Sequence, residues 1–413
     1  MAPLFVGVSD MQAPDDNTFT ITLKQPSASF LRNVSTRSTT LLIYPPQVPK
    51  ADWYKTMVGT GPFRLKQLDQ TTKLVVEPDR NYWKVDGNGQ QLPFLDGVEW
   101  HKFTDYTNAA AAYKTGRINA ITGGILTTTG AGHADEFRAA QPGSNLQIVV
   151  AGTDHFWVFA NKAPWNDKRV RQAIRIGYDY KAHAETISSP GINYWYGSVL
   201  LPSEFGGEWG LPLDEIKKIP GWTGDRAKEL AMAKQLLADA GLAPGHNTKV
   251  VATLMSTSMN ADGELIQQLL KPLGFDVQPK IFQTAEAATV QRSGTWDMYH
   301  MFGVSAGEPA DYLIPTLGTG GLTNYGNWSN PTLDKLFAEQ EVTLDTNKRR
   351  EMLYQVQRIV LDESYVMPEY WIGALYGVGP GVHNFKPGDK TPYFYNTSSA
   401  YRYERIWIDK AKQ

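Results

Sequence analysis

Residues 160–180 read ANKAPWNDKRVRQAIRIGYDY, and this stretch joins two different patterns. The apolar run at 156–160 predicts a strand, which ends in a polar Pro-Trp-Asn-Asp turn. From Lys168 onward, apolar residues recur at helical spacing, which predicts an amphipathic helix. Its basic side chains lie mostly off the apolar face: Lys168, Arg169, Arg171 and Arg175. We therefore expect a solvated helix edge rather than an anion site.

Composition limits the class of protein. The chain has 413 residues, 42% of them hydrophobic, which suits one large domain or two to three ordinary ones. A net charge of −2 argues against nucleic acid as the main partner. There is no cysteine, which excludes disulfides and cysteine nucleophiles. No run approaches the ~18 apolar residues of a membrane span, and residues 1–16 lack the pattern of a signal peptide.

Strand and helix patterns alternate through the middle of the chain. Period-two alternation predicts strands in TFTITLKQ (18–25) and VEWHKF (98–103), and FDVQPKIF (275–282) is predicted to be another strand. Helical spacing predicts a helix in TGDRAKELAMAKQLLADAGL (223–242). Residues 188–220 are instead rich in Pro, Gly and aromatics, a long irregular segment of the kind that is usually functional. The alternation favours an α/β fold with partly parallel sheets.

One catalytic pattern is present. Residues 303–307 read GVSAG, the G-x-S-x-G of an α/β-hydrolase elbow, so an esterase using Ser305 is the alternative function. Pro309 would interrupt the helix that must follow the serine, and His383 is the only later histidine. The histidines show no metal-binding spacing, and GTGPF and GTGGL are too short for phosphate or dinucleotide loops. We therefore expect no catalytic residue, no metal and no cofactor.

A family resemblance explains the opening stretch. FANKAPWNDKRVRQAIRIGYDYKAHAE (159–185) resembles a segment of ABC-transporter solute-binding proteins of the dipeptide, oligopeptide and nickel group. In that family a strand ending in Asn leads through a Pro-Phe-Asp-Asp-type turn to a V-R-Q-A helix. Further stretches agree in the family's order: PDDNTFTITLKQPSASFL, VGTGPFRLKQ with NYW, DRAKELAMAKQLLADAGL, NYGNWSNPTLDKLF and TNKRREMLYQVQRIVLDESYVMPEYW.

The resemblance implies a periplasmic-binding-protein-like fold of type II, with two α/β lobes of mixed sheets and a hinge. It divides the chain into a remnant of the amino-terminal and small domain at 1–53, a large lobe at 54–185, a pocket lobe at 186–380, and a return to the large lobe at 381–413. Family members carry an export signal and a further stretch before the element matching 15–31. By this resemblance, the amino-terminal part of the large lobe and most of a small extra domain are absent.

The implied function is binding without catalysis. The protein would be a periplasmic or otherwise extracytoplasmic, monomeric component of an ABC importer, which captures a ligand between two lobes and delivers it to the permease subunits. Aligned on Gly307-Glu308-Pro309, Ser305 stands where peptide-binding members carry an Asp for the ligand's ammonium, and Phe302 where they carry a stacking Trp. A buried ligand charge without a partner costs several kcal/mol. An oligopeptide or oligosaccharide is therefore expected rather than a free dipeptide.

The resemblance places the pocket wall around 299–328. The expected ligand-binding residues are Phe302, Ser305, Asp311, Tyr312, Tyr325 and Trp328, with Trp195 and Tyr196 from the irregular segment. Ordinary core packing is the alternative role for each aromatic ring. For Asp311 the alternative is a helix cap or a turn.

Overall fold

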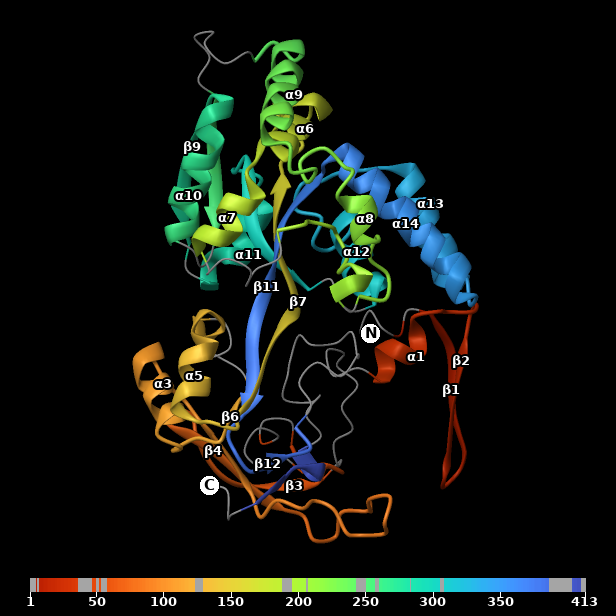
Figure 1. The fold of residues 1–413 in the computed structure, drawn as a ribbon. Coiled ribbons are helices and arrows are strands. Elements are labelled where there is room, and N and C mark those ends of the chain that lie inside the picture. Colours follow the sequence, from red (N-terminus) through yellow and green to blue (C-terminus); the bar gives the residue numbers. More distant parts are fainter. Residues whose placement is uncertain are drawn as a thin grey trace. The chain divides into compact units, whose positions relative to one another are not determined.

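The computed structural model describes residues 5, 7–35, 47–49, 52, 58–122, 129–187, 195–205, 207–242, 250–256, 260–282, 284–304, 308–385 and 403–409. The chain divides into two compact units (Figure 1). Unit 1 comprises residues 1–36 and 150–372, and unit 2 comprises residues 37–149 and 373–413. Each unit is therefore built from separate stretches of the chain.

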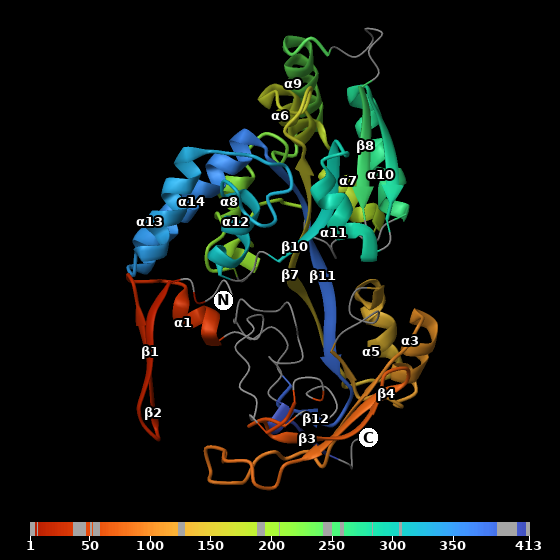
Figure 2. The same ribbon diagram turned by 180° about the vertical axis from the view of Figure 1, so that it is seen from behind.

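One mixed sheet has the strand order β6-β11-β7-β10-β8-β9 (Figures 1 and 2). Its strands are β6 (Ala120–Ile121), β7 (Asn145–Phe159), β8 (Val250–Ser256), β9 (Phe275–Ile281), β10 (Met298–Val304) and β11 (Val366–Val378). β8 is parallel to both β9 and β10, whereas β10 is antiparallel to β7. The expected α/β fold with partly parallel strands is confirmed.

The helices of unit 1 pack on this sheet and on one another. α6 packs against α9 and α14, α10 packs on β9, and α13 packs on α14. The helices are α1 (Phe30–Ser35), α6 (Lys168–Gly177), α7 (Tyr180–Ile187), α8 (Leu213–Ile216), α9 (Arg226–Asp239), α10 (Asn260–Leu270), α11 (Thr284–Ser293), α12 (Pro309–Leu317), α13 (Pro331–Val342) and α14 (Thr346–Glu363), with short 3₁₀ turns at Ser203–Phe205 and Lys271–Leu273. In the described residues, no helix is long and apolar enough to cross a membrane.

Polar caps determine where these helices begin. Asp167 accepts from the backbone N–H of Arg169 at the start of α6. Asn330 accepts from the amides of residues 332 and 333, and Pro331 occupies the first turn of α13, where its missing N–H costs nothing. Asp345 accepts from two amides at the start of α14. Each cap satisfies donors that have no partner within the helix.

The basic residues of α6 are not all solvated, which corrects the expectation for this helix. Arg171 and Arg175 are 2% and 4% exposed. Arg171 Nε donates to the carbonyl oxygen of Glu363 at 3.0 Å, and Arg175 Nε donates to Ser364 Oγ at 3.0 Å. Both cations therefore lie at the carboxyl end of α14, where free carbonyls carry negative potential. Lys168 and Arg169 lie at the surface as expected, with side chains 37% and 49% exposed.

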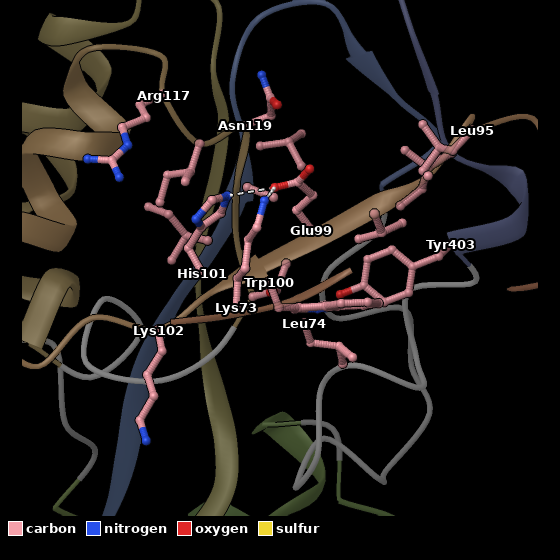
Figure 3. A pocket seen from close by; sticks show the side chains of 18 of the residues that line it. Lys73, Leu74, Leu95, Glu99, Trp100, His101, Lys102, Arg117, Asn119 and Tyr403 are labelled. Atoms are coloured by element: carbon pink, nitrogen blue, oxygen red, sulfur yellow. Dashed lines mark hydrogen bonds and ion pairs between the residues drawn. The ribbon is translucent and has the colours of Figure 1, made fainter. Parts of the chain in front are cut away.

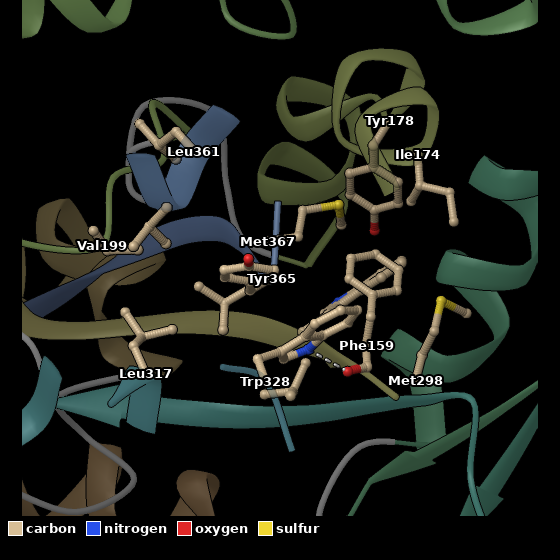
Figure 4. Packing of buried hydrophobic residues seen from close by; sticks show 14 of the residues in the cluster. Phe159, Ile174, Tyr178, Val199, Met298, Leu317, Trp328, Leu361, Tyr365 and Met367 are labelled. Carbon is tan, nitrogen blue, oxygen red and sulfur yellow. Dashed lines mark hydrogen bonds between the residues drawn. The ribbon is translucent and has the colours of Figure 1, made fainter. Parts of the chain in front are cut away.

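The core of unit 1 is rich in aromatic residues (Figure 4). Trp157 and Phe159 of β7 are fully buried, together with Tyr178 and Met298. The rings of Trp157 and Tyr178 meet edge to face at 5.0 Å, a favoured geometry for aromatic pairs. This core gives the loops of unit 1 a rigid support.

Unit 2 contains a three-stranded antiparallel sheet in the order β3-β4-β5. Its elements are β3 (Phe63–Asp69), β4 (Lys73–Pro78), β5 (Val98–His101), α3 (Tyr106–Lys114), a 3₁₀ turn at Thr129–His133, α5 (Ala134–Ala140), β12 (Val382–His383), a 3₁₀ turn at Tyr403–Arg405, and β13 (Trp407–Ile408). Within these three strands only Val75 is buried, with 8% of its surface exposed. The faces of this sheet are therefore poorly covered.

Two strands belong to both units. The unit boundaries at 149/150 and 372/373 fall inside β7 and β11. The lobe ranges expected from the sequence, 54–185 and 186–380, differ from this division, since residues 150–185 lie in unit 1 with residues 186–372. The stretch 1–36, expected within a 1–53 remnant, also lies in unit 1 and contains a hairpin of β1 (Val8–Asp15) and β2 (Thr18–Leu23) that is largely exposed.

Candidate functional site

The residues expected to bind ligand come from several elements of unit 1. Phe302 lies in β10, where it pairs with His155 of β7, and Asp311 lies in the first half of α12. The structure does not describe the side chains of Phe302 and Asp311, and Ser305 lies outside the described residues. Their ligand roles therefore stay predictions.

Tyr312 and Tyr325 are both partly buried and pack against the core of unit 1. The ring of Tyr325 lies 6.4 Å from that of Tyr299 at a tilt of 52°. Both residues keep part of their surface accessible. This placement is compatible with the predicted role and also with ordinary packing at the margin of a core.

Trp328 is a core residue. Its indole N–H donates to the carbonyl oxygen of Phe159 at 2.9 Å, and its ring stacks on Tyr365 at 4.7 Å (Figure 4). The guanidinium of Arg171 lies 4.3 Å from the ring centroid. With 8% of its surface exposed, Trp328 has its polar group and its ring faces engaged inside the protein. Its position supports the packing alternative.

Trp195 and Tyr196 form an aromatic stack at the edge of unit 1. Their ring centroids are 4.0 Å apart and their planes 25° apart, and both residues are partly buried. The ammonium of Lys217 lies 5.2 Å from the Tyr196 ring, within the range of a cation–π contact. The stack combines two flat apolar faces with a positive charge, which suits a planar, polar ligand group.

A buried glutamine holds the loop that follows this stack. Gln357 of α14 accepts through Oε1 from the Ser198 hydroxyl at 3.0 Å and from the Leu211 amide at 3.1 Å. Its Nε2 donates to the carbonyl oxygens of Trp209 and Leu353 at 2.8 and 3.0 Å. Both polar atoms of the Gln357 side chain, Oε1 and Nε2, therefore have two hydrogen-bond partners each within the core. The irregular segment 195–211 is therefore attached to a long helix.

A second anchor lies at the start of α12. Glu308, the residue before α12, has a fully buried side chain that forms an ion pair with Arg349 of α14. Arg32 adds a contact of 3.6 Å to the same carboxylate. Arg349 also donates to Gln340 Oε1 at 2.9 Å. The sequence did not indicate this ion pair, because the partner of Glu308, Arg349, lies 41 residues away in the chain. Glu308 served there only to align the chain with the family.

The carboxylate of Glu369 in β11 is also fully buried in unit 1. His300 Nε2 of β10 lies 2.7 Å from Oε2, and His183 Nδ1 of α7 lies 3.3 Å from Oε1. The Tyr178 hydroxyl lies 2.7 Å from His183 Nδ1 and 3.4 Å from Glu369 Oε1. Burial by itself would raise the pKa of Glu369, but the two histidines outweigh it and lower that pKa. Sequence reasoning missed this cluster.

Unit 2 contains a cavity of about 860 Å³ (Figure 3). It is lined by β5, by β6 and by the chain around β12 and β13. On β5, Glu99 Oε2 accepts from Lys73 Nζ at 3.1 Å and lies 3.4 Å from His101 Nε2, so the pKa of Glu99 is lowered, chiefly by the Lys73 contact. Among the described residues, no group of three or more His, Cys, Asp or Glu side chains is placed to hold a metal ion.

Comparisons with known proteins give a consistent result. The family model described as "Bacterial extracellular solute-binding proteins, family 5 Middle" matches residues 2–324. The chain is 25% identical to the glutathione-binding protein GsiB of Pectobacterium atrosepticum, over 86% of this chain and 66% of that protein. It is 24% identical to the dipeptide-binding protein DppE of Bacillus subtilis, over 87% of this chain and 64% of that protein. The chain thus spans about two thirds of the length of these relatives.

Solved structures share the fold. NikA from Brucella suis, in complex with Fe(III)-EDTA, superposes with a TM-score of 0.78 at 17% identity, covering 98% of this chain and 80% of that one. AppA from Bacillus subtilis, in complex with a nonapeptide, superposes with a TM-score of 0.72 at 18% identity, covering 98% of this chain and 79% of that one. The mixed α/β fold therefore matches over nearly the whole chain.

Proposed function

This chain belongs to family 5 of the bacterial extracellular solute-binding proteins, and we propose that it captures a peptide-like ligand for an ABC importer. Members of this family bind solutes and are not enzymes. The Trp195–Tyr196 stack carries the proposal, since it is a partly exposed aromatic pair on a loop that Gln357 holds in place. The relatives include proteins named for binding glutathione and dipeptides, which supports a ligand with peptide bonds.

We further propose that units 1 and 2 act as the two lobes of the binding protein and move by bending of β7 and β11. The support is that both unit boundaries fall inside these strands. The few residues at such a boundary can absorb changes in backbone angles while each unit keeps its own core. The permease partner, the extracytoplasmic location and a monomeric state belong to the same proposal.

The proposed ligand is longer than a dipeptide. The family resemblance implies that Ser305 takes the position at which peptide-binding members carry the Asp that pairs with a ligand ammonium, and a serine offers no charge. An oligopeptide held through its backbone, with its termini in water, avoids the cost of burying an unpaired charge. An oligosaccharide, which is neutral and also stacks on aromatic rings, is the second candidate.

A thermal-shift and calorimetry series tests this proposal. We expect tetra- to nonapeptides to stabilise the protein and Ala-Ala to give little or no shift. A ligand at one hundred times its dissociation constant stabilises a protein by about 2.7 kcal/mol, which such assays detect readily. A robust shift with Ala-Ala would contradict the ligand class, and a shift with cello-oligosaccharides alone would favour the second candidate.

The same assay tests the aromatic stack. Trp195→Ala is expected to weaken peptide binding about tenfold, because one aromatic contact contributes roughly 1 kcal/mol beyond its buried area. Trp83→Ala is the matched control, since Trp83 is 71% exposed and lies in unit 2. If the two substitutions weakened peptide binding equally, the Trp195–Tyr196 stack would not be part of the binding site.

The esterase alternative makes a separate prediction. We expect no labelling of Ser305 by a fluorophosphonate probe and no hydrolysis of p-nitrophenyl esters above the level of the Ser305→Ala variant. The reason is that α12 begins at Pro309, four residues after the serine, with Glu308 fixed by Arg349, whereas a nucleophile elbow has the serine directly before its helix. Labelling that Ser305→Ala abolishes would establish the hydrolase.

A further inference from the structure

A small apolar cluster lies where β7 and β11 pass from one unit into the other. The unit boundaries fall at 149/150 in β7 and at 372/373 in β11. On the unit 1 side of these boundaries, Val150 and Trp371 are buried together with Leu201. Phe205 is partly buried and packs against these three residues, and we call the four together the hinge cluster. Both strands therefore contact the same loop directly beside the proposed hinge.

The loop that supplies Leu201 and Phe205 is tightly closed. The Phe205 amide donates to the Pro202 carbonyl oxygen at 3.0 Å, so the chain turns sharply there. A Cβ atom on Gly207 or Gly210 would lie only 1.7 or 1.9 Å from the Leu201 carbonyl oxygen. Glycine therefore allows the returning chain to pack directly on Leu201. The backbone of the loop leaves Leu201 no room to shift away from β7 and β11.

The same loop is attached to the rest of unit 1 on both sides of the hinge cluster. Gln357 of α14 accepts hydrogen bonds from the Ser198 hydroxyl and from the Leu211 amide. The Trp195–Tyr196 stack, which we propose as a ligand contact, lies just before Ser198 in the chain. One anchored loop therefore connects the proposed ligand contact with the two strands of the proposed hinge.

Trp371 contributes packing to the hinge cluster rather than a hydrogen bond. Its side chain is 0% exposed, and its indole N–H has no hydrogen-bond partner among the residues that the structure describes. A buried donor without an acceptor is unfavourable, so the burial of the large ring must outweigh it. Gly373, the first residue past the boundary, has no Cβ and tolerates more backbone angles than other residues. A fixed Trp371 next to this glycine favours bending at the boundary itself.

We propose that the hinge cluster holds β7 and β11 on the unit 1 side of the boundaries and thereby fixes where the two strands bend. This inference rests on the proposed function, in which the two units move about these strands. Trp371 is then a positioning residue, which acts through the strands and the loop. With the cluster intact, bending is confined to a few residues, so little conformational freedom is lost when a ligand is captured. Without it, capture must order a longer stretch of chain.

Spin labels test the proposal on the full chain, which has no cysteine of its own. Ala231→Cys on α9 and Ala139→Cys on α5 place one label at an exposed helical position in each unit. Double electron–electron resonance then gives the distribution of distances between the labels. We expect Trp371→Ala to broaden this distribution about twofold in the ligand-free protein, because the strands then bend over a longer stretch. Trp371→Phe keeps an aromatic ring and loses an N–H that has no partner, so we expect a width close to that of the wild type.

Two further variants separate the hinge cluster from general destabilisation. Phe205→Ala opens the cluster from the loop side at a partly buried position, so the protein should stay folded while the distribution broadens. Trp296 is 0% exposed in the main core of unit 1, so Trp296→Ala should lower the free energy of unfolding without broadening the distribution. Wild-type widths in both Trp371→Ala and Phe205→Ala would overturn the proposal. Equal broadening by Trp296→Ala would overturn it as well.

Peptide titration distinguishes this inference from the proposed function. Trp371→Ala is expected to bind an oligopeptide about tenfold more weakly than the wild type, because a smaller fraction of molecules has the strands placed for capture. Trp371→Phe should bind like the wild type, and equal affinities of Trp371→Ala and wild type would contradict the role of the cluster. If no peptide changed the wild-type distances, the proposed function would fail, whereas the ligand-free widths would still decide whether the hinge cluster holds the strands.

Discussion

Replacing Glu369 with glutamine is expected to lower the free energy of unfolding by about 3 kcal/mol, because it breaks a buried charge cluster. The carboxylate is fully buried and lies 2.7 Å from His300 Nε2 and 3.3 Å from His183 Nδ1. Glutamine keeps the shape but removes the negative charge, and its amide N–H₂ group cannot accept a hydrogen bond. The two histidine rings then lose the negatively charged partner that they contact inside the core.

Urea unfolding followed by tryptophan fluorescence measures this effect, with Glu215→Gln as the matched control. Glu215 forms a bidentate pair with Arg358 at 2.6 and 2.9 Å, but its side chain is 34% exposed. Solvent screening limits such a pair to about 0–1 kcal/mol. Similar losses from the two substitutions would mean that the buried cluster contributes no more than a surface ion pair.

The same pair of proteins gives a pH prediction. The pKa of Glu369 is lowered in the folded protein, where burial acts against the lowering and the charges of His300 and His183 outweigh it. A group with a lowered pKa stabilises the fold above its unfolded pKa, about 4.3 for glutamate, and loses that contribution as the pH falls below it. The difference in unfolding free energy between wild type and Glu369→Gln should therefore be larger at pH 6 than at pH 3. A constant difference would contradict the charge argument.

Arg349→Met is expected to lower the free energy of unfolding by about 3–5 kcal/mol. This is the usual cost of removing one partner of a buried ion pair, here the partner of the Glu308 carboxylate. The Glu308 side chain is fully buried, and its remaining cation, Arg32, lies 3.6 Å away with 27% of its side chain exposed. The Arg349 guanidinium also lies 4.7 Å from the Trp209 ring, so its loss leaves a gap in the packing. Faster hydrogen exchange at the start of α12 should accompany the loss.

Two comparisons show whether this effect comes from the buried charge. Arg350→Met alters the neighbouring residue, which is partly exposed and donates to Asn347 Oδ1 at 2.9 Å, so we expect a loss of about 0–1 kcal/mol. The double variant Glu308→Gln/Arg349→Met removes both charges and should recover part of the stability of Arg349→Met. A double variant less stable than Arg349→Met would show that packing, rather than the unpaired carboxylate, sets the cost.

The sequence by itself predicted the local elements correctly. The strand, turn and helix expected at 156–178 are β7 and α6, and Asp167 caps the helix as its place before the periodic segment suggests. The alternation in TFTITLKQ and VEWHKF corresponds to β2 and β5. These features depend on neighbours within a few residues, through side-chain periodicity and capping, so the sequence contains all that determines them.

The candidate site was predictable only in part. Trp195 and Tyr196 were expected in a functional loop, and the structure places their rings in a stack at 4.0 Å, while their ligand role stays a prediction. Trp328 fits the same aromatic pattern, yet its hydrogen bond to Phe159 lies within the core. Composition cannot separate these cases, because an aromatic ring serves a pocket wall and a core equally well.

Only the tertiary structure decided where the charges lie. The amphipathic pattern of α6 placed Arg175 at a solvated edge, but it donates to Ser364, 189 residues away, at the carboxyl end of α14. Glu369 sits in the apolar run of β11, and its partner His300 is 69 residues away. Within the part of the chain that the structure describes, the places of β5 and β6 in their sheets likewise depend on which strands become neighbours. Whether a charge is buried and paired depends on groups that folding brings together from distant parts of the chain. The periodicity of the sequence does not indicate which groups these are.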